Sequence, residues 1–181
     1  MGRWSTIARR IRVPAGFVLA GLYLWLARPT VQSLAFGTPV VVLGLLLRGA
    51  ASGELRKNEQ LATTGPYAYT RNPLYLGSLI IAGGFSIAAR SLWIALAMLV
   101  MFVVIYLPVI RAEERYLAEN FAEFCDYARR VPRFIPRLGQ RSRTPSAFRW
   151  ELYRKHREYN AILGSGVTVA ALLAKLLWMG H

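Results

Sequence analysis

The stretch that decides the fold is PLYLGSLIIAGGFSIAARSLWIALAMLVMFVVIYLPVI, residues 73–110. Arg90 is its single charged residue, and it stands between two apolar runs, 73–89 and 92–110. Each run is slightly short for a hydrocarbon core about 30 Å thick at a rise of about 1.5 Å per helical residue, and flanking residues can complete each span. The stretch therefore predicts a tight hairpin of two membrane-spanning helices, with Ser91 as the N-cap of the second.

Three more apolar runs flank this hairpin, at 13–27, 31–47 and 161–179. The five runs together hold one charge, Lys175, and 55% of the 181 residues are hydrophobic. A soluble all-α bundle with buried helices is the alternative, but helices of soluble proteins are rarely so free of charge. The sequence predicts an all-α, polytopic membrane protein with about five transmembrane helices.

The chain carries a net charge of +14, and the placement of its charges argues for membrane topology rather than nucleic-acid binding. If the N-terminus is cytoplasmic and each run spans once, the inner segments hold all nine acidic residues and most of the 23 lysines and arginines. The outer turns hold only Arg28 and Arg90. This is the positive-inside distribution, and the inner charges also suit anionic lipid. We expect an integral membrane protein, in a bacterial inner membrane given the Arg- and Ala-rich composition, and no nucleic-acid partner.

Cysteine and histidine are too sparse to suggest a disulfide or a metal site. Cys125 is the only cysteine, and the two histidines, His156 and His181, lie far from it in the sequence.

The N-terminus, basic and then apolar, resembles a secretory signal peptide. Because no clear small-residue cleavage site follows it and four more spans do, we expect a retained first helix.

The polar segments divide the chain into three parts: an N-terminal transmembrane hairpin (1–51), a core (52–136), and a C-terminal part (137–181) with a basic linker, an interfacial helix and the final span. Within the core, the aromatic and apolar spacing of residues 112–130 predicts one amphipathic helix, which the prolines of VPRFIP (131–136) should end.

Smaller signals concern individual elements. Gly49 and Gly53, near the inner end of the second span, have the spacing of close helix packing. Pro108 should bend the fourth span near its end. PSAFRWELYRKHREYN, residues 145–160, interleaves aromatic and basic residues in a way typical of a helix at the membrane surface.

A first polar constellation lies in TTGPYAYTRNPLYLG, residues 63–77. Asn72 and Pro73 predict a helix start, because Asn is a good N-cap and Pro is favoured at the first helical position. The first-turn N–H groups, with Arg71 beside them, would make an anion site. The tyrosines of this stretch offer flat faces and hydroxyls. The alternative is an interfacial belt, in which these residues only mark the headgroup level.

The second constellation is the pair Glu113–Glu114, directly after an apolar span. The hairpin returns the chain close to where residue 72 left it, so we expect Glu113 to lie near Arg71 and Asn72. An ion pair of Glu113 with Arg71, or a solvated helix turn, is one interpretation. The other is a cytoplasmic pocket with an anion-binding end and a cation-binding end, which a zwitterion such as an amino acid would fit.

Residues 63–77, EERYL at 113–117 and VPRFIP at 131–136 together resemble the isoprenylcysteine carboxyl methyltransferase (ICMT) family. They are also similar to the related phospholipid N-methyltransferases. Both groups are integral-membrane enzymes that use S-adenosylmethionine. Their pattern is arginine, histidine, proline, any residue, tyrosine, any residue, glycine, and then a glutamate pair. The resemblance covers about residues 52–136 and is specific as a set rather than in any one piece.

The resemblance implies that residues 52–136 form a methyltransferase core that binds S-adenosylmethionine at the cytoplasmic side. Carried over position by position, it implies a cofactor site made of Gln60, Leu61, Ala62, Tyr67, Asn72, Pro73, Leu74, Tyr75 and Glu113. Asn72 departs from the family's usual histidine. It can still cap a helix and donate a hydrogen bond, but it cannot act as a base or carry a charge, which puts any proton transfer there in doubt.

The activity implied is ICMT-like methyl transfer to a lipophilic acceptor, a lipid or small molecule entering from the membrane, with no metal. A carboxylate acceptor needs no base and could be oriented by Arg71 or Arg111, whereas an amine needs a base, for which Glu114 is the nearest candidate. Arg71 and Glu114 are therefore the predicted catalytic residues. Three alternatives stay open: a phospholipid amine N-methyltransferase, an NADPH-dependent sterol-type reductase, and a non-catalytic membrane scaffold. A transporter is disfavoured because charges near mid-bilayer are absent.

Overall fold

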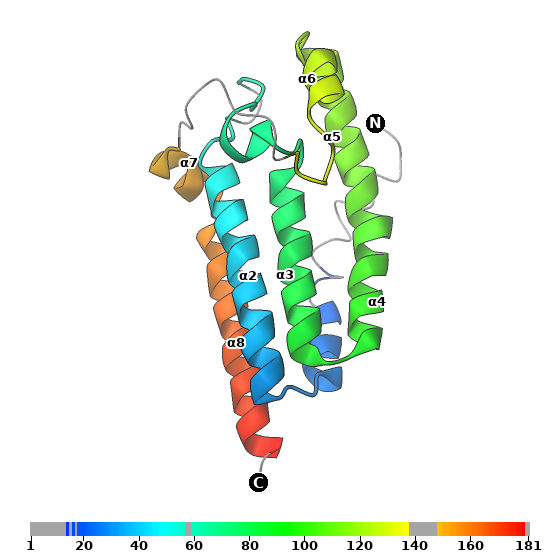
Figure 1. Ribbon diagram of the computed structural model, residues 1–181, viewed down its shortest axis with the longest axis vertical. Coiled ribbons are helices and arrows are strands. Elements are labelled where there is room, and N and C mark those ends of the chain that lie inside the picture. Colours follow the sequence, from blue (N-terminus) through cyan, green and yellow to red (C-terminus); the bar gives the residue numbers. More distant parts are fainter. Residues whose placement is uncertain (1–13, 15, 17, 57–58, 138–147, 180–181) are drawn as a thin grey trace.

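The computed structural model describes residues 14, 16, 18–56, 59–137 and 148–179 (Figure 1). These residues are helical or irregular, with no strand among them, which confirms the all-α class for this part of the chain. Residues 18–26 form a helix, here called the N-terminal helix. The elements that follow are α2 (Val31–Ser52), the 3₁₀ helix η1 (Gly65–Ala68), α3 (Pro73–Ala89), α4 (Leu92–Met101), the π-helical turn η2 (Phe102–Tyr106), α5 (Leu107–Asn120), α6 (Phe124–Arg130), α7 (Trp150–Lys155) and α8 (Tyr159–Met179).

Three described helices are long and apolar enough to cross a membrane: Val31–Ser52, Leu92–Asn120 and Tyr159–Trp178. Pro73–Ala89 is also apolar but has only 17 residues. The predicted run at 13–27 is only partly described. The membrane-protein class is thus supported by three candidate spans, and the count of five remains a prediction.

Helices α2 and α3 pack against each other through glycines, which let the two backbones approach closely. A Cβ added at Gly37 would lie 2.6 Å from the Gly84 carbonyl oxygen, and one at Gly44 would lie 2.7 Å from the Gly77 carbonyl oxygen. Small residues at such contacts are typical of membrane helix pairs. The spacing of Gly49 and Gly53 suggested that they would form this close contact, but they do not take part in it. Those two glycines instead face the aromatic rings of Tyr153 and Phe148, respectively.

We expect Gly84→Ala to lower the free energy of unfolding by about 1–3 kcal/mol, the cost of overpacking a close contact. The new methyl group would lie 2.7 Å from both the Gly37 carbonyl oxygen and the Val41 amide nitrogen, and backbone atoms cannot swing aside. Gly83→Ala is the matched control, because nothing lies within 4 Å of a Cβ at that position. Denaturant unfolding of the detergent-solubilised variants measures the difference, and equal stability of the two would contradict the close packing.

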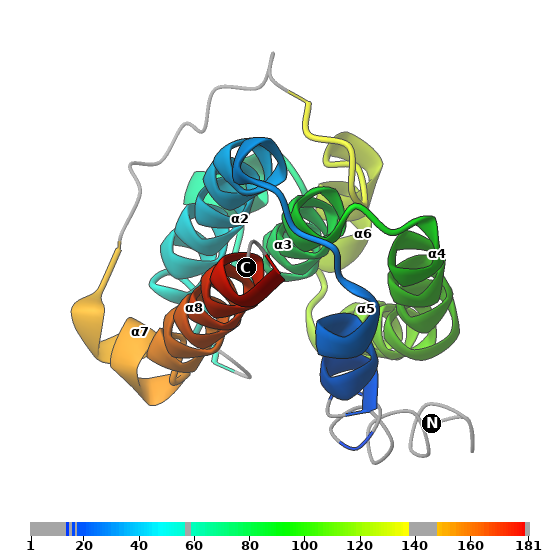
Figure 2. The same cartoon turned by 90° about the horizontal axis from the view of Figure 1, so that it is seen from below.

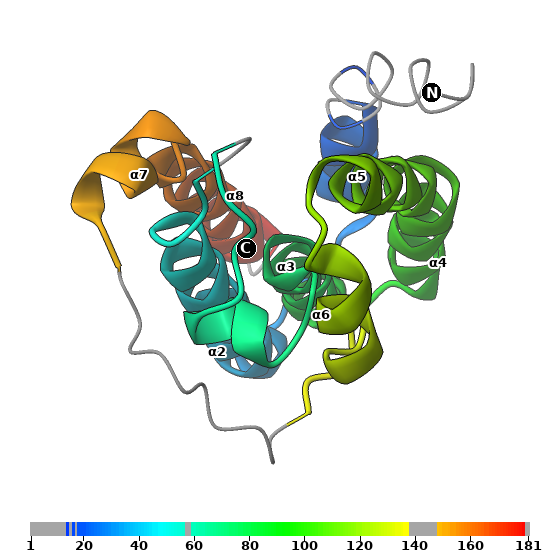
Figure 3. The ribbon, with the colours of Figure 1, turned by 90° about the horizontal axis from the view of Figure 1, so that it is seen from above.

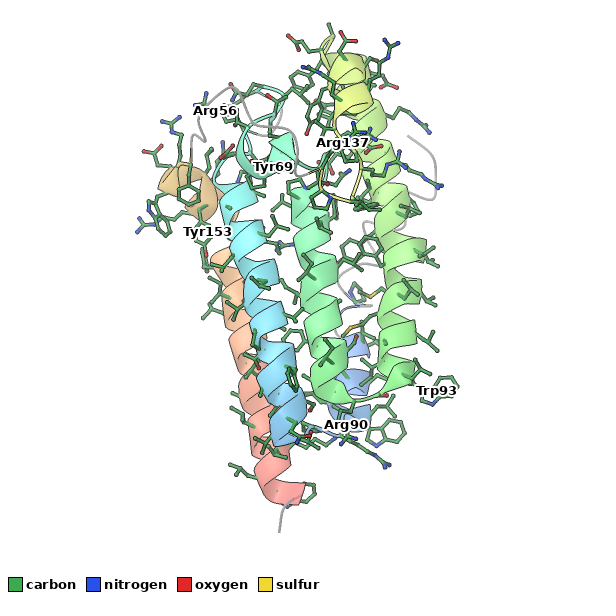
Figure 4. The ribbon with its side chains drawn as sticks, in the orientation of Figure 1. Arg56, Tyr69, Arg90, Trp93, Arg137 and Tyr153 are labelled. Carbon is green, nitrogen blue, oxygen red and sulfur yellow. The ribbon has the colours of Figure 1, made fainter. Side chains whose placement is uncertain are left out.

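The end of the bundle that carries Arg90 and Trp93 lies opposite the end that carries Tyr69 and Arg137 (Figure 4). The Arg28 N–H donates to the Ala89 carbonyl at 2.9 Å, so the two turns predicted to share one membrane face do lie together. The N-terminal helix joins this end through the Tyr23 hydroxyl, which donates to the Phe85 carbonyl at 3.0 Å.

Side chains cap the helices at this end. Ser91 accepts a hydrogen bond from the Ile94 N–H, which confirms it as the N-cap of α4. Lys175 of α8 donates to the Leu24 and Trp25 carbonyls at 2.6 and 3.0 Å. A cation at the carbonyl end of a helix is stabilised by the helix dipole, so Lys175 ties α8 to the end of the N-terminal helix.

The fourth apolar run continues past the hairpin without a break, because α4, η2 and α5 join end to end as one 29-residue helix. The π-helical turn Phe102–Tyr106 precedes Pro108, the residue expected to bend this helix.

The predicted single amphipathic helix over 112–130 is wrong. Its first half is the end of α5, Phe121 has extended backbone (φ −129°, ψ 111°), and its second half is α6. This break lets Phe124 and Tyr127 fold back into a cluster with Leu61.

The C-terminal part contains a short helix and a long one. Of the surface helix predicted at 145–160, residues 145–147 lie outside the described residues. Among the rest, Trp150–Lys155 forms α7, and Arg157 (φ 53°) separates it from α8. Figure 2 shows α8 running beside α2. The predicted basic residues before residue 14, and all of the basic stretch 137–145 except Arg137, lie outside the described residues.

Candidate cofactor-binding site

Two segments far apart in sequence form the frame of the candidate site at the polar end of the bundle. Residues 69–72, just before α3, lie against residues 131–137, just after α6 (Figure 3). The hydrogen bonds that hold the segments together include Arg71 N to Pro132 O (2.9 Å), Arg137 N to Tyr69 O (3.1 Å), and Thr70 Oγ1 to Arg133 O (3.0 Å). VPRFIP therefore does more than end a helix, because it fixes the approach to α3.

Asn72 stands at the N-cap position of α3, but its side chain makes no capping hydrogen bond. Its amide instead donates to Glu114 Oε1 at 3.0 Å and to the Arg133 carbonyl at 3.3 Å. The prediction that Asn72 and Pro73 start the helix is confirmed, whereas side-chain capping by Asn72 is wrong. Capping would need the side-chain oxygen of Asn72 to accept from a first-turn N–H, whereas the two bonds donated by its amide nitrogen fix the side chain toward Glu114 and Arg133.

Glu114 lies at the centre of this frame, with its side chain 10% exposed. Arg133 donates to it through Nε at 3.0 Å and Nη2 at 2.6 Å, both to Oε2, and Arg71 Nη1 lies 3.6 Å from Oε1. The hydrogen bond to Glu114 raises the pKa of the Arg133 guanidinium. The structure thus gives the direct contacts with Arg71 and Asn72 to Glu114, while the adjacent Glu113 contacts Tyr75 in the first turn of α3. The ion pair considered for Glu113 exists one residue later.

Glu113 has a different environment. The Tyr75 hydroxyl, from the first turn of α3, donates to Glu113 Oε2 at 3.1 Å. In Tyr67 of η1, burial raises the pKa of the phenol, and the negative charge of Glu113 raises it further. Two residues carried over to the cofactor site, Tyr75 and Glu113, are therefore in direct contact. A carboxylate beside an aromatic ring suits a bound cation.

Aromatic rings extend from Tyr75 along the π-helical turn. Tyr106 meets Tyr75 edge-on at 6.1 Å, stacks on Phe102 at 5.7 Å, and Phe102 in turn lies 5.8 Å from Phe134. The ring of Phe134 comes from the 131–137 segment, so this aromatic wall joins α3, η2 and the frame. Single π-helical turns occur often at functional sites, where they reposition side chains.

The other predicted site residues lie around this centre in different ways. Leu61 packs on Phe124, Tyr127 and Val131, and Pro73 is fully buried. The Leu74 carbonyl accepts from Arg48 Nη1 at 3.3 Å, while the amide oxygen of Gln60 accepts from Arg56 at 3.4 Å in an exposed position. Ala62 is half-buried. The roles of these residues in cofactor binding remain predictions.

Arg71 combines a paired and an unpaired donor. Its Nη1 faces Glu114, but its Nε is buried and has no hydrogen-bond partner among the described residues. A buried N–H without a partner is costly, about 1–3 kcal/mol, and its presence at a site indicates an acceptor that the protein itself does not supply. Arg71 is therefore suited to a bound anion.

Sequence reasoning missed Glu54, a buried carboxylate at the end of α2. The Thr64 hydroxyl donates to Glu54 Oε2 at 2.6 Å, and Gly65, with φ 52°, lies so close that any Cβ there would overlap the carboxylate. Glu54 thereby holds the turn that leads into Tyr67. The available signal was an acid in the polar segment shortly after an apolar run, weaker than for Glu113 and Glu114 because residues 48–53 stand between the run at 31–47 and Glu54.

Comparison with protein families finds that the family described as phospholipid methyltransferase matches residues 12–123, more than half of the chain. The chain belongs to the phospholipid methyltransferase family. This membership confirms the resemblance seen in the sequence. The matched region contains Arg71, Asn72 and the glutamate pair. The 131–137 segment, α7 and α8 lie outside the part that the phospholipid methyltransferase family defines.

Two curated relatives share part of this family region. A cobalt-zinc-cadmium resistance protein of Cupriavidus metallidurans is 45% identical over 84 residues, and a nickel-cobalt-cadmium resistance protein of Alcaligenes xylosoxydans is 43% identical over 84 residues. Each alignment covers 46% of this chain and 39% of the relative, so the chain spans about two fifths of the length of the relatives it matches. No solved structure matches the chain. Among the described residues, no group of three or more His, Cys, Asp or Glu side chains could hold a metal ion.

Proposed function

We propose that this protein is an integral-membrane methyltransferase that uses S-adenosylmethionine and methylates a lipophilic acceptor at the cytoplasmic surface. The observation that carries the proposal is the pairing of an anion-binding end with a cation-binding end beside the start of α3. Arg71 supplies a buried N–H that has no hydrogen-bond partner in the described part of the chain, and Glu113 with Tyr75 supplies a carboxylate for a cation. Membership of the phospholipid methyltransferase family supports the reaction class.

The residues present fit the charges of the proposed cofactor. Its amino-acid part carries a carboxylate, which suits Arg71 Nε, and an ammonium, which suits Glu113. When bound, S-adenosylmethionine supplies a methyl group on a positively charged sulfur, open to in-line displacement. Tyr67 and the aromatic wall give an apolar surface that excludes water and keeps the acceptor in line.

The contacts of Glu114 change the role proposed for it. Its two oxygens are occupied by Asn72 and Arg133, so an acceptor amine could reach the carboxylate only by displacing them. We infer that Glu114 positions the 131–137 segment and Arg71 rather than moving a proton. A carboxylate acceptor of the ICMT type needs no base and agrees with this arrangement, with Arg71 or Arg111 orienting it.

A phospholipid amine is the second candidate acceptor, favoured by the description of the family. The two are distinguished by incubating the purified protein with methyl-labelled S-adenosylmethionine and total membrane lipid. A methyl ester releases its label in mild base, whereas an N-methyl group keeps it. Labelled lipid of neither kind, with every acceptor pool tested, would contradict the proposed activity.

Cofactor choice can be tested without knowing the acceptor. We expect S-adenosylhomocysteine, at about 100 times its dissociation constant, to stabilise the detergent-solubilised protein by ~2.7 kcal/mol. NADPH should give no comparable gain, because the Glu113 carboxylate suits an ammonium rather than a nucleotide phosphate. Thermal unfolding with each ligand is the measurement. Stabilisation by NADPH alone would move the protein to the sterol-type reductases, and stabilisation by neither would support a scaffold.

A further inference from the structure

A second feature of the protein lies away from the candidate cofactor site. A groove of about 550 Å³ opens between α2, α7 and α8, within the range of roughly 300–1,000 Å³ typical of small-molecule sites. Its walls are almost entirely apolar, and they include Leu46 and Gly49 of α2, Trp150 and Tyr153 of α7, and Ile162 of α8. Tyr153 marks its position near the polar end of the bundle (Figure 4).

The groove and the helix that carries Glu113 and Glu114 lie on different sides of the α2–α3 pair. Seen from above, α7 and α8 lie on one side of α2, whereas α4 and α5 lie on the far side of α3 (Figure 3). Glu113 and Glu114 are on α5, and no residue carried over to the cofactor site lines the groove. The groove is therefore distinct from the predicted cofactor residues, and its wall combines α2, inside the matched region, with α7 and α8, outside it.

The groove lies where the bilayer would reach it. Its α2 and α8 walls belong to two candidate membrane spans, at the ends closest to the polar surface. Only 11% of the most apolar window of α8 is buried inside the protein. Trp150, 67% exposed at the groove, has the amphipathic ring that membrane proteins place at headgroup level. An apolar hollow at this depth suits a lipid acyl chain.

Charge at the mouth of the groove indicates the kind of lipid. The carboxylate of Glu158, its one acidic wall residue, is neutralised by Arg48, with Nε–Oε2 and Nη2–Oε1 distances of 3.0 and 2.8 Å. α7 and its two flanking turns carry four cations. Arg149 lies 3.6 Å from Glu151 and Lys155 lies 3.8 Å from Glu59 in exposed ion pairs, which leaves Arg154 and Arg157 without an ion pair among the described residues. Basic residues beside a cleft between membrane helices complement an anionic headgroup.

We propose that this groove binds one anionic phospholipid, with an acyl chain between α2 and α8 and its phosphate among the basic residues of α7. The lipid fills the space between two helices that have little direct packing. Its effect reaches the start of α3, because Arg48 joins Glu158 to the Leu74 carbonyl. The proposal rests on the groove and its charges and does not depend on methyl transfer.

Native mass spectrometry of the delipidated protein with added phosphatidylglycerol or phosphatidylcholine tests the proposal. We expect wild type to retain one phosphatidylglycerol at least tenfold more strongly than phosphatidylcholine. Gly49→Leu should abolish this retention, since the side chain fills the groove beside Tyr153, whose ring lies 3.6 Å from a Cβ at this position. Gly164→Leu is the matched control on a lipid-facing surface, because nothing lies within 4 Å of its Cβ.

The headgroup arm uses a variant that leaves the groove open. The double substitution Arg154→Gln and Lys155→Gln should reduce the preference for phosphatidylglycerol several-fold, and added salt should weaken it in wild type. This arm decides the question even if Gly49→Leu fails to fold. Equal retention of the two lipids by wild type, or unchanged preference in the double variant, would overturn the proposal. So would a lipid-free dimer that Gly49→Leu breaks, which would assign the groove to a second copy.

Discussion

Glu114→Ala is expected to lower the free energy of unfolding by about 3 kcal/mol, the low end of the 3–5 kcal/mol that removal of one partner from a buried ion pair costs. The carboxylate is 10% exposed and holds Arg133, Arg71 and Asn72 together. The low end applies because Arg133 is 40% exposed and can turn to solvent, whereas Arg71, at 16%, cannot do so easily. Denaturant unfolding of the purified variant in a fixed detergent measures the loss.

Two controls separate this role from a purely catalytic one. Glu119→Ala, an exposed carboxylate on the same helix, should change stability by no more than about 0.5 kcal/mol. A double-mutant cycle of Glu114→Ala with Arg133→Ala should give a coupling energy of about 0.5–3 kcal/mol, because the residues are in direct contact. If Glu114→Ala is as stable as Glu119→Ala and the coupling is zero, Glu114 does not organise the frame, and the role of proton acceptor becomes the better account.

The arrangement of the helices was largely predictable, because it depends on long apolar runs and on where charges interrupt them. The hairpin around Arg90, the Ser91 cap and the start of α3 at Pro73 all follow from local sequence. The glycine contacts between α2 and α3 could not be predicted from local sequence. Gly37 and Gly44 meet Gly84 and Gly77 only because α2 and α3 pair in one register, and nothing local to either helix sets that register.

The contact of Arg71 with Glu114 rather than Glu113 has a similar cause. Neighbouring residues on an α-helix point about 100° apart, so a rotation of one residue swaps the carboxylate that faces Arg71. The π-helical turn Phe102–Tyr106 inserts such a rotation into the helix that carries both acids. An apolar run gives no sign of a π-helical turn, so the sequence could place the acidic pair near Arg71 without settling which acid would bind it.

Glu54 and Arg133 illustrate what local patterns cannot reveal. Arg133 lies in VPRFIP, a stretch in which the prolines were the visible signal, and its partner Glu114 is 19 residues away. The partner of Glu54, Thr64, lies across a turn whose shape depends on Gly65. The carboxylates of Glu54 and Glu114 are buried by contacts that form only after the chain has folded. Both contacts fix backbone around the candidate site rather than facing a ligand.

Glu113→Gln is expected to reduce the affinity for S-adenosylhomocysteine tenfold or more, corresponding to about 1.5–3 kcal/mol for a hydrogen bond to a charged group. The amide keeps the shape of the side chain and can still accept from the Tyr75 hydroxyl, whose oxygen lies 3.1 Å from Glu113. What it loses is the negative charge that would hold the ammonium. Isothermal titration calorimetry in detergent gives the affinity, and thermal unfolding without ligand shows whether the fold survives.

Tyr75→Phe separates charge from hydrogen bonding at the same position. It removes the hydroxyl but leaves the Glu113 charge, so its effect on affinity should be smaller, about 0.5–1.5 kcal/mol for a neutral donor. The comparison of the two losses of affinity shows whether Glu113 acts through its charge. If Glu113 only anchored Tyr75 for the sake of the fold, both variants would lose stability alike and bind the ligand as wild type does. A larger loss of affinity in Glu113→Gln, at unchanged stability, requires a positive charge on the bound ligand beside this carboxylate. Equal affinity of Glu113→Gln and wild type would leave Glu114 and its arginines as a structural frame with no cation site beside it.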